Sequence, residues 1–186
     1  MKNVFWLIPG KLAGRTGPNV DPWDPAELKR HGIGAVLSVN SGNLVDGAAL
    51  EACGITYGCI PFSWNAPPLT GDIEICLEAL PKAFAFVQQN IAAGKTVMVH
   101  CTSGKDRTGL LMSYYLMRTK RLSIDQAIAE VRRVRPIAGA DRGDRFCQRS
   151  IVRAVQAQVP GPNRRSGRVL PGRPGGELHR RQRRPG

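Results

Sequence analysis

Residues 97–109, Val-Met-Val-His-Cys-Thr-Ser-Gly-Lys-Asp-Arg-Thr-Gly, join an apolar run to a cysteine and, six residues later, to an arginine. The run at 97–99 predicts a buried strand, and the apolar residues that follow Gly109 predict a helix. A strand, a short loop and a helix N-terminus gather backbone N–H groups around one point, which is how many proteins bind anions. The stretch therefore predicts an α/β fold with an anion-binding loop between a strand and a helix.

Two side chains of this loop carry chemistry. Cys101 opens it, at a position where a helix N-terminus and nearby cations lower the pKa of a thiol from about 8.5 to roughly 3.5–7.5. Arg107 closes it with a planar fork of donors that binds two phosphoryl oxygens at once. The five intervening residues let the loop amides converge on one tetrahedral anion, and Gly104 permits a backbone conformation that a side chain would obstruct. A thiolate aimed at phosphorus among such donors indicates a phosphatase.

The neighbours of these two residues fit the same chemistry. His100 is placed to hydrogen-bond locally and to hold the shape of the loop. Thr108 puts a hydroxyl beside the sulfur, where it helps the thiolate to leave when phosphocysteine is hydrolysed. The predicted phosphate-binding residues are those of the loop itself: Thr102, Ser103, Gly104, Lys105, Asp106 and Arg107.

The pattern His100-Cys101-x5-Arg107-Thr108 resembles the signature of the cysteine-dependent protein tyrosine phosphatase superfamily, most of all the small dual-specificity phosphatases. The run at 104–109 is also similar to atypical bacterial members and to phosphoinositide phosphatases. The resemblance implies a phosphoric monoester hydrolase that works through a phosphocysteine intermediate, with no metal or organic cofactor. It implies a phosphorylated protein as substrate, with phosphotyrosine favoured, or a phosphoinositide, with Lys105 directed at a second anionic group.

No residue of this pattern is an obvious proton donor for the leaving oxygen. By the family's register an Asp should lie near Trp64, yet no carboxylate occurs between Glu51 and Asp72. Two candidates remain: Asp106, as in some atypical bacterial and phosphoinositide-type relatives, and Asp72, if the proline-rich loop folds over the site. Phenolic leaving groups need less protonation than alkyl ones, so a weak acid favours phosphotyrosine or aryl phosphates.

Further residues have weaker assignments. Trp64 either lines the mouth of the pocket, where it stacks on a substrate ring, or packs in the core or on the surface. Arg15 is a candidate for another cation beside the site. The family also places a polar residue after the Arg135-Pro136 step to position the hydrolytic water, and here Asp141 or Gln148 takes that role.

The chain has 186 residues and a formal net charge of +13, which is unevenly distributed. Residues 159–186 contain eight arginines, five prolines and six glycines, but one acid, Glu177. Such a segment cannot bury enough apolar surface to order itself. We therefore expect a phosphatase domain at 1–158 and a disordered basic tail at 159–186, which is either simply solvated or a weak contact to nucleic acid or anionic lipid.

Strands and helices alternate along the rest of the chain. Strands are predicted at 4–8 and 11–13 as a hairpin, and at 35–39, 55–62 and 96–99; helices at 24–32, 48–53, 72–92, 110–120, 123–134 and 144–156. This order implies an α/β fold with a central, mostly parallel sheet flanked by helices, similar to that of the dual-specificity phosphatases. Pro81 is expected to kink the longest helix.

Composition excludes several other classes. No apolar run approaches the roughly 20 residues that a membrane span needs, and the dispersed histidines and cysteines have no metal-ligand spacing. Five cysteines without a CxxC pair indicate no disulfide framework, so we expect a reducing, cytoplasmic environment. Two alternatives to a protein phosphatase stay open: a catalytically weak phosphate-binding module, because the loop acid is missing, and an RNA 5′-phosphatase, which the basic tail would suit.

Overall fold

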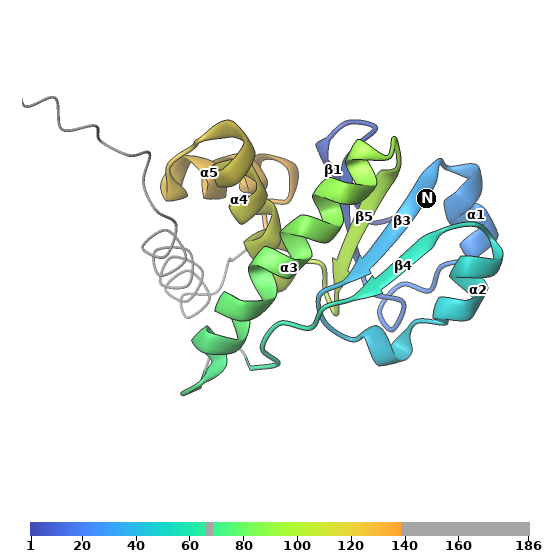
Figure 1. Cartoon of the computed structure of the whole chain (residues 1–186), viewed down its shortest axis with the longest axis horizontal. Helices are drawn as coiled ribbons and strands as arrows, with labels where there is room; N and C mark the ends of the chain where they lie inside the picture. Colours follow the sequence, from blue (N-terminus) through green and yellow to red (C-terminus); the bar gives the residue numbers. More distant parts are fainter. Residues whose placement is uncertain (66–68, 139–186) are drawn as a thin grey trace, which may run out of the picture.

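The computed structural model describes residues 1–65 and 69–138. Its sheet has five strands in the order β1-β2-β5-β3-β4, with β1 antiparallel to β2 and all other neighbours parallel (Figure 1). The strands are β1 (Val4–Ile8), β2 (Leu12–Thr16), β3 (Ile33–Ser38), β4 (Thr56–Cys59) and β5 (Thr96–Cys101). The predicted mostly parallel sheet is confirmed, and the strand that carries Cys101 lies at its centre.

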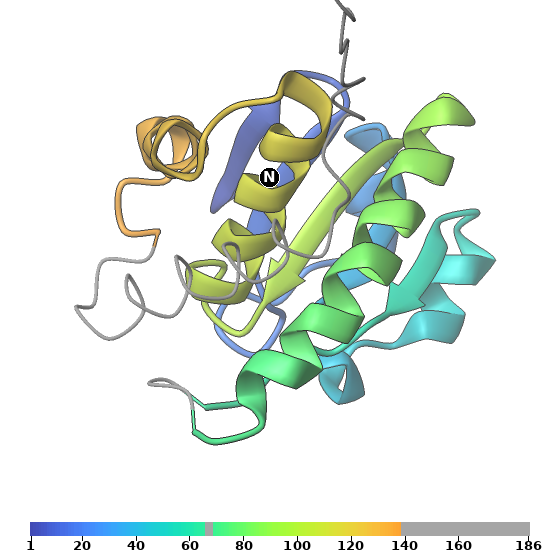
Figure 2. The ribbon, with the colours of Figure 1, turned by 60° about the vertical axis from the view of Figure 1, so that its left-hand side comes forward.

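Helices cover both faces of this sheet. They are α1 (Pro25–Arg30), α2 (Gly47–Ala52), α3 (Asp72–Ala92), α4 (Asp106–Lys120) and α5 (Ile124–Val134), with a 3-10 turn η1 (Gly42–Leu44). Helices α3, α4 and α5 pack on one face, and α1 and α2 on the other (Figure 2). None of the described helices is both long enough and apolar enough to cross a membrane.

Side-chain alternation along β5 divides its residues between two cores. Val97, Val99 and Cys101 are buried in the larger core, against α3, α4 and α5, while Met98 belongs to the smaller core under α1 and α2. His100 contacts Trp23, which packs against that smaller core, with the two ring centroids 4.8 Å apart. The side chains of His100 and Cys101, which are neighbours at the end of β5, thus lie on opposite faces of the sheet.

The ends of several helices follow the sequence signals. Asp24 caps α1 by accepting hydrogen bonds from the amides of Ala26 and Glu27. Ser123 and Gln126 form a capping box at the start of α5. These local signals place helix termini correctly because each cap acts on backbone groups only two or three residues away.

Other boundaries differ from the predictions. Strand β4 ends at Cys59 because Pro61 has no N–H for the ladder, although Ile60 and Phe62 still donate to carbonyls of the β3 segment. Helix α4 begins at Asp106, four residues early, since the end of the Cys101 loop itself adopts the first helical turn. Helix α3 continues through Pro81 to its full predicted length. The predicted helix at 144–156, the tail at 159–186, and the candidates Asp141 and Gln148 lie outside the described residues.

Candidate active site

The loop between β5 and α4 depends on a glycine. Gly104 has φ +61°, and a Cβ there would collide with the carbonyl group of Arg15 and the amide nitrogen of Thr16 on the neighbouring strand β2. The next residue of that segment, Gly17, donates its N–H to the carbonyl of Thr102 at 3.0 Å. The end of β2 therefore supports the loop from behind, and only glycine fits at position 104.

Cys101 and Thr108 are buried on either side of this loop. Cys101 ends β5 with 1% of its surface exposed, and Thr108 lies in the first turn of α4. The Thr108 hydroxyl oxygen has no hydrogen-bond partner in the described part of the chain. No hydrogen bond joins this oxygen to the Cys101 sulfur among the described residues, so the role of Thr108 beside that sulfur stays a prediction.

His100 is a buried member of a chain of polar groups. Its Nε2 lies 2.6 Å from the Ser38 hydroxyl, which lies 2.9 Å from the hydroxyl of Tyr57, and its Nδ1 lies 3.4 Å from the Cys101 carbonyl oxygen. Burial lowers the pKa of His100 to about 4, so the imidazole is neutral near pH 7. A neutral, hydrogen-bonded ring agrees with the predicted role of holding the loop in shape.

Two residues that the sequence analysis missed lie beside Thr102. The hydroxyl of Ser41 lies 2.6 Å from the hydroxyl of Thr102 and donates to Oδ1 of Asn40 at 2.9 Å. Asn40 and Ser41 follow β3, and Thr102 follows β5, so these residues lie at the carboxyl ends of two neighbouring parallel strands. The signal available in the sequence was a pair of polar residues directly after a buried strand.

Arg135 is a third residue that contacts the loop and that the sequence analysis missed. Its guanidinium donates to the carbonyl oxygens of Ser103 (3.1 Å) and Gly104 (3.4 Å) and lies over the ring of Phe5, 5.1 Å from the ring centroid. These bonds fix two peptide groups of the Cys101 loop. The sequence placed Arg135 in the family's Arg-Pro step without indicating this contact.

Arg15 does not supply the additional cation that was predicted. Its buried guanidinium donates to a carboxylate oxygen of Asp21 at 2.8 Å and to the Asp21 carbonyl at 2.7 Å, and it lies 5.1 Å from the centroid of the Trp23 ring. Burial lowers the pKa of Arg15, and the Asp21 charge opposes that shift. The prediction was wrong because an ion pair within the β2–α1 segment occupies the side chain.

Arg107, in the first turn of α4, contacts the segment that follows β4. Its Nε donates to the carbonyl oxygen of Ser63 at 2.9 Å, and its Nη2 donates to those of Trp64 at 2.6 Å and Asn65 at 3.1 Å. The side chain of Trp64 is 63% exposed and so is not part of the core. The proline-rich loop therefore meets the Cys101 loop at Arg107, as the sequence hypothesis about this loop requires.

Asp72 begins α3 under the same loop. Its carboxylate accepts hydrogen bonds from the Leu69 amide at 2.6 Å and from the Asn65 side-chain amide at 2.9 Å. These bonds, together with Ser63 and the charge of Arg107, hold the pKa of Asp72 below its ordinary value. A carboxyl group kept ionised is a poor proton donor near pH 7, so this environment does not favour Asp72 as the general acid.

Residues 19–143, about two thirds of the chain, match the family model of the dual specificity phosphatase catalytic domain. The chain belongs to this family. It is 29% identical over 121 residues to dual specificity protein phosphatase 12 of Mus musculus, an alignment that covers 64% of this chain and 33% of the mouse protein. It is 28% identical over 116 residues to phosphatidylglycerophosphate phosphatase PTPMT2 of Arabidopsis thaliana, covering 61% of this chain and 48% of that one. The matched region thus spans a third to a half of these two relatives.

A solved structure shows the same fold. The active form of Tk-PTP superposes with a TM-score of 0.65 at 23% sequence identity, covering 85% of this chain and 99% of that one. The likeness confirms the predicted dual-specificity phosphatase fold, with its mostly parallel sheet and flanking helices.

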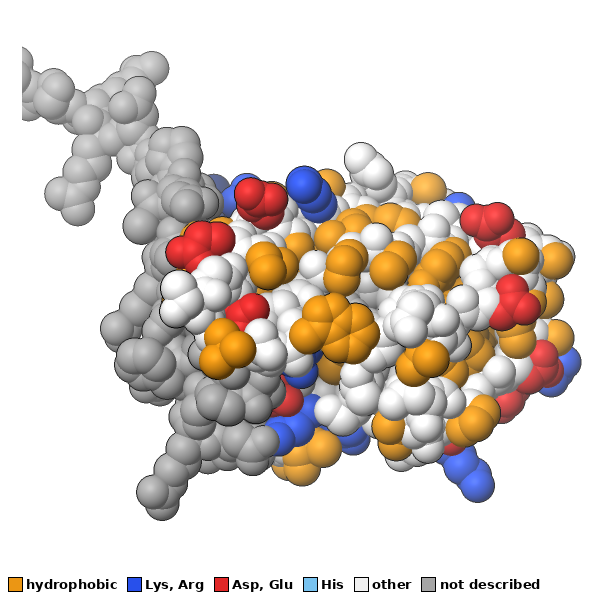
Figure 3. Space-filling model, turned by 90° about the horizontal axis from the view of Figure 1, so that it is seen from below, with side chains coloured by type: hydrophobic (Ala, Val, Ile, Leu, Met, Phe, Trp, Pro, Cys, Tyr) orange, Lys and Arg blue, Asp and Glu red, His pale blue; other side chains and the backbone are white. Residues whose placement is uncertain are grey.

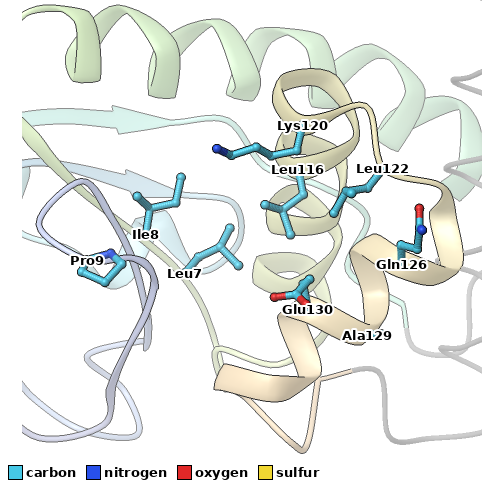
Figure 4. Close-up of a pocket in the computed structure, with 9 residues that line it drawn as sticks. All are labelled: Leu7, Ile8, Pro9, Leu116, Lys120, Leu122, Gln126, Ala129 and Glu130. Carbon is cyan, nitrogen blue, oxygen red and sulfur yellow. The ribbon is translucent and has the colours of Figure 1, made fainter.

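In this dual-specificity phosphatase domain a hollow of about 670 Å³ lies away from the Cys101 loop (Figure 4). It lies between β1 with the turn after it and the segment where α4 leads into α5. Because Ile8 pairs with Leu12 at the start of β2, while Cys101 pairs with Thr16 at its end, the hollow and the cysteine lie toward opposite edges of the sheet. The hollow is lined by Leu7, Ile8, Pro9, Leu116, Lys120, Leu122, Gln126, Ala129 and Glu130. It is therefore separate from the candidate active site.

Proposed function

We propose that this chain hydrolyses phosphate monoesters through a phosphocysteine formed on Cys101. The observation that supports the proposal most directly is the buried cysteine at the end of the central strand, followed by the loop that Gly104 makes possible and by Arg107 in the next helix. A helix N-terminus with converging amides and an arginine is suited to a phosphoryl group. The family to which the chain belongs supports the same chemistry.

The proposed reaction has two displacements. The Cys101 sulfur attacks phosphorus while the bond to the ester oxygen breaks, and that oxygen leaves with a proton. Water then attacks the phosphocysteine, and the sulfur leaves as a thiolate next to the Thr108 hydroxyl. Loop amides and Arg107 stabilise the charge on the phosphoryl oxygens in both steps. Asp106, half-buried in the first turn of α4, is the proposed proton donor.

The proposed substrates are phosphorylated proteins, with phosphotyrosine favoured. The loop segment 60–65 contains no carboxylate, and the environment of Asp72 keeps that residue ionised. A site with weak acid assistance acts best on esters whose leaving oxygen is itself acidic, as a phenol is. A dual-specificity domain with these features thus prefers aryl phosphates to alkyl phosphates.

Turnover of an aryl phosphate by the full chain tests the proposal. We expect Cys101→Ser to abolish turnover while tungstate, a phosphate-like oxyanion, still binds. Cys59→Ser, at an exposed cysteine that ends β4, is the matched control and should keep full activity. Wild-type protein that binds tungstate but never turns over the ester would instead support the catalytically weak phosphate-binding module.

A phospholipid monoester is the second candidate substrate. One face of the molecule carries hydrophobic side chains across its middle, with most charged groups toward its margins (Figure 3). Six large hydrophobic side chains of the described residues are 46% to 64% exposed: Val20, Leu44, Trp64, Leu69, Ile75 and Ile137. Contiguous patches of exposed apolar side chains mark contacts with proteins or membranes. A relative named as a phosphatidylglycerophosphate phosphatase adds support, and the phosphoinositide hypothesis belongs to the same class.

The remaining sequence hypotheses are also proposals. A reducing, cytoplasmic environment, expected from the dispersed cysteines of the sequence, is one of them. The RNA 5′-phosphatase alternative depends on the composition of residues 159–186 alone, and so does contact of that segment with nucleic acid or anionic lipid. Relative turnover of phosphotyrosine peptide, phosphoinositide and 5′-triphosphate RNA by the full chain ranks these substrates.

A further inference from the structure

The contacts of Arg107 with the segment after β4 bear on how it binds phosphate. A guanidinium grips two oxygens of a phosphoryl group through parallel N–H bonds on adjacent nitrogens. One such edge pairs Nε with Nη2, and the other pairs Nη1 with Nη2. In this structure Nε donates to Ser63, while Nη2 donates to both Trp64 and Asn65.

Both edges of the Arg107 fork therefore include a nitrogen that already donates to carbonyl oxygens. A phosphate cannot receive two parallel N–H bonds from Arg107 until at least one of the two Nη2 contacts is released. The carbonyls of 63–65 thus compete with phosphate for the same donors. Because of this competition, only molecules whose guanidinium is released can bind phosphate in this way. The apparent dissociation constant for phosphate therefore equals the intrinsic constant divided by the fraction of such molecules.

The competing carbonyls are tied to a rigid element by Asp72. Its carboxylate accepts from the side-chain amide of Asn65 and from the amide of Leu69, so it holds both sides of the loop. The backbone N–H of Asn65 donates to the Ser63 hydroxyl at 3.2 Å. Asp72 is itself buried at the start of α3, a 21-residue helix packed on the larger core.

We propose that Asp72 is a positioning residue that sets the affinity of the site for phosphate. Its carboxylate holds Asn65, and through Asn65 the carbonyls at 63–65, on the Arg107 guanidinium. The inference rests on the proposed function, because it takes the Cys101 loop as a phosphate site. It assigns Asp72 a role that requires the ionised carboxylate, in contrast to proton donation, which requires the protonated one.

Two variants release this contact in different ways. Asp72→Asn keeps the size of the side chain and removes its charge, while Asn65→Ala removes the tethering amide from an exposed position that threatens no core packing. Glu74→Gln is the matched control, since it removes an exposed acid from the same helical turn. Tungstate binding by calorimetry measures oxyanion affinity without turnover, and hydrolysis of an aryl phosphate gives kcat and KM separately.

We expect both variants to lower the tungstate dissociation constant and KM by roughly fivefold to tenfold, by enlarging the fraction of molecules with an available fork. Glu74→Gln should leave both values unchanged. The pH profile of kcat should keep its shape in Asp72→Asn, because no proton donor has been removed. Melting curves of each variant establish that the fold is retained, and Asn65→Ala decides the question alone if Asp72→Asn does not fold.

Three results would overturn the inference. Tungstate affinity that is unchanged or weaker in Asn65→Ala means that the carbonyls do not compete with the anion. A fall in kcat in Asp72→Asn, steeper for alkyl than for aryl esters and with loss of the alkaline limb of the pH profile, identifies Asp72 as the proton donor. Wild-type protein that neither binds tungstate nor hydrolyses the ester overturns the proposed function and this inference together, whereas the first two results overturn the inference alone.

Discussion

Cys101 and His100 are neighbours on β5, but their side chains lie on opposite sides of the sheet. Cys101 is buried against α3, α4 and α5, while His100 contacts Ser38 and Trp23 on the other side. The ring must be neutral in that site, because burial lowers its pKa to about 4. At the residue scale, β5 therefore ends in the proposed nucleophile, next to an imidazole that the fold keeps uncharged.

This neutral ring predicts an acid-sensitive stability. The pKa of His100 is about 4 in the fold and near 6.5 in the unfolded chain, so between these values the unfolded state binds the additional proton. The contribution is complete above about pH 6.5 and is lost as the pH falls, amounting to roughly 2 kcal/mol between pH 7 and pH 5. Urea unfolding at both pH values measures it.

The difference between the two pH values should shrink by that amount in His100→Asn. An equal pH dependence in wild type and His100→Asn would contradict the burial argument.

Gly104 gives a second prediction at the residue scale. Its φ of +61° costs a residue with a side chain about 1–2 kcal/mol, and a Cβ would also collide with the Arg15 carbonyl. Gly104→Ala should therefore distort the loop and weaken tungstate binding by about tenfold or more, as a loss of this size implies. Calorimetry with tungstate measures the change.

Gly10→Ala separates the two effects, since Gly10 has a similar φ of +69° but no atom near the position of a Cβ. That variant should lose some stability and keep full tungstate affinity. Equal affinities in the two variants would mean that the collision with β2 does not shape the loop.

At the scale of elements, local signals were predictable and long-range contacts were not. The capping residues of α1 and α5 and the apolar face of α3 follow from residues close in sequence. The contact of Ser41 with Thr102 joins positions 61 apart in the chain, and that of Arg135 with Ser103 joins positions 32 apart. Such pairs arise only from the packing of the segments, so no local pattern predicts them.

The same reasoning applies to Asp72 and Arg15. The sequence left Asp72 open as an acid because its distance from the Cys101 loop depends on how the loop at 60–71 folds. The ion pair with Asp21 that occupies the Arg15 guanidinium was likewise not predicted. The sequence states which side chains are available, but the partner that each one contacts depends on the tertiary structure.

Pro81 provides a prediction for a whole element. It lies in the interior of α3 and is exposed to solvent, and it lacks the N–H that would bond the carbonyl of Leu77. Pro81→Ala restores that bond and should raise stability by about 1–3 kcal/mol. Thermal and urea unfolding measure the gain, and Lys82→Ala at the next exposed position is the control. A melting temperature that falls in Pro81→Ala would show that the packing of α3 requires the shape imposed by proline.

At the scale of the molecule, exposed apolar side chains are concentrated near one edge of the sheet. Val20 follows β2, and Leu44 lies in η1 after β3. Trp64 and Leu69 follow β4, and all these segments leave the carboxyl ends of parallel strands, as the Cys101 loop does. The large hydrophobic residues exposed in the described ranges therefore include several that lie on the same edge as the proposed nucleophile.

This arrangement predicts how activity depends on the presentation of the substrate. If the second candidate function holds, Val20 and Leu44 enter the lipid surface while a phosphate monoester reaches Cys101. Replacing both by serine should then lower hydrolysis of a phosphatidylglycerophosphate in vesicles by about tenfold or more, since each buried aliphatic side chain contributes about 1.5–3 kcal/mol. Hydrolysis of a soluble aryl phosphate should not change, because neither side chain belongs to the Cys101 loop.

Leu122→Ala, in the hollow of Figure 4 toward the opposite edge of the sheet, is the control for lost apolar surface. Equal activity of wild type and the Val20→Ser/Leu44→Ser variant on vesicles would rule out this surface as a lipid contact and leave phosphorylated proteins as the proposed substrates.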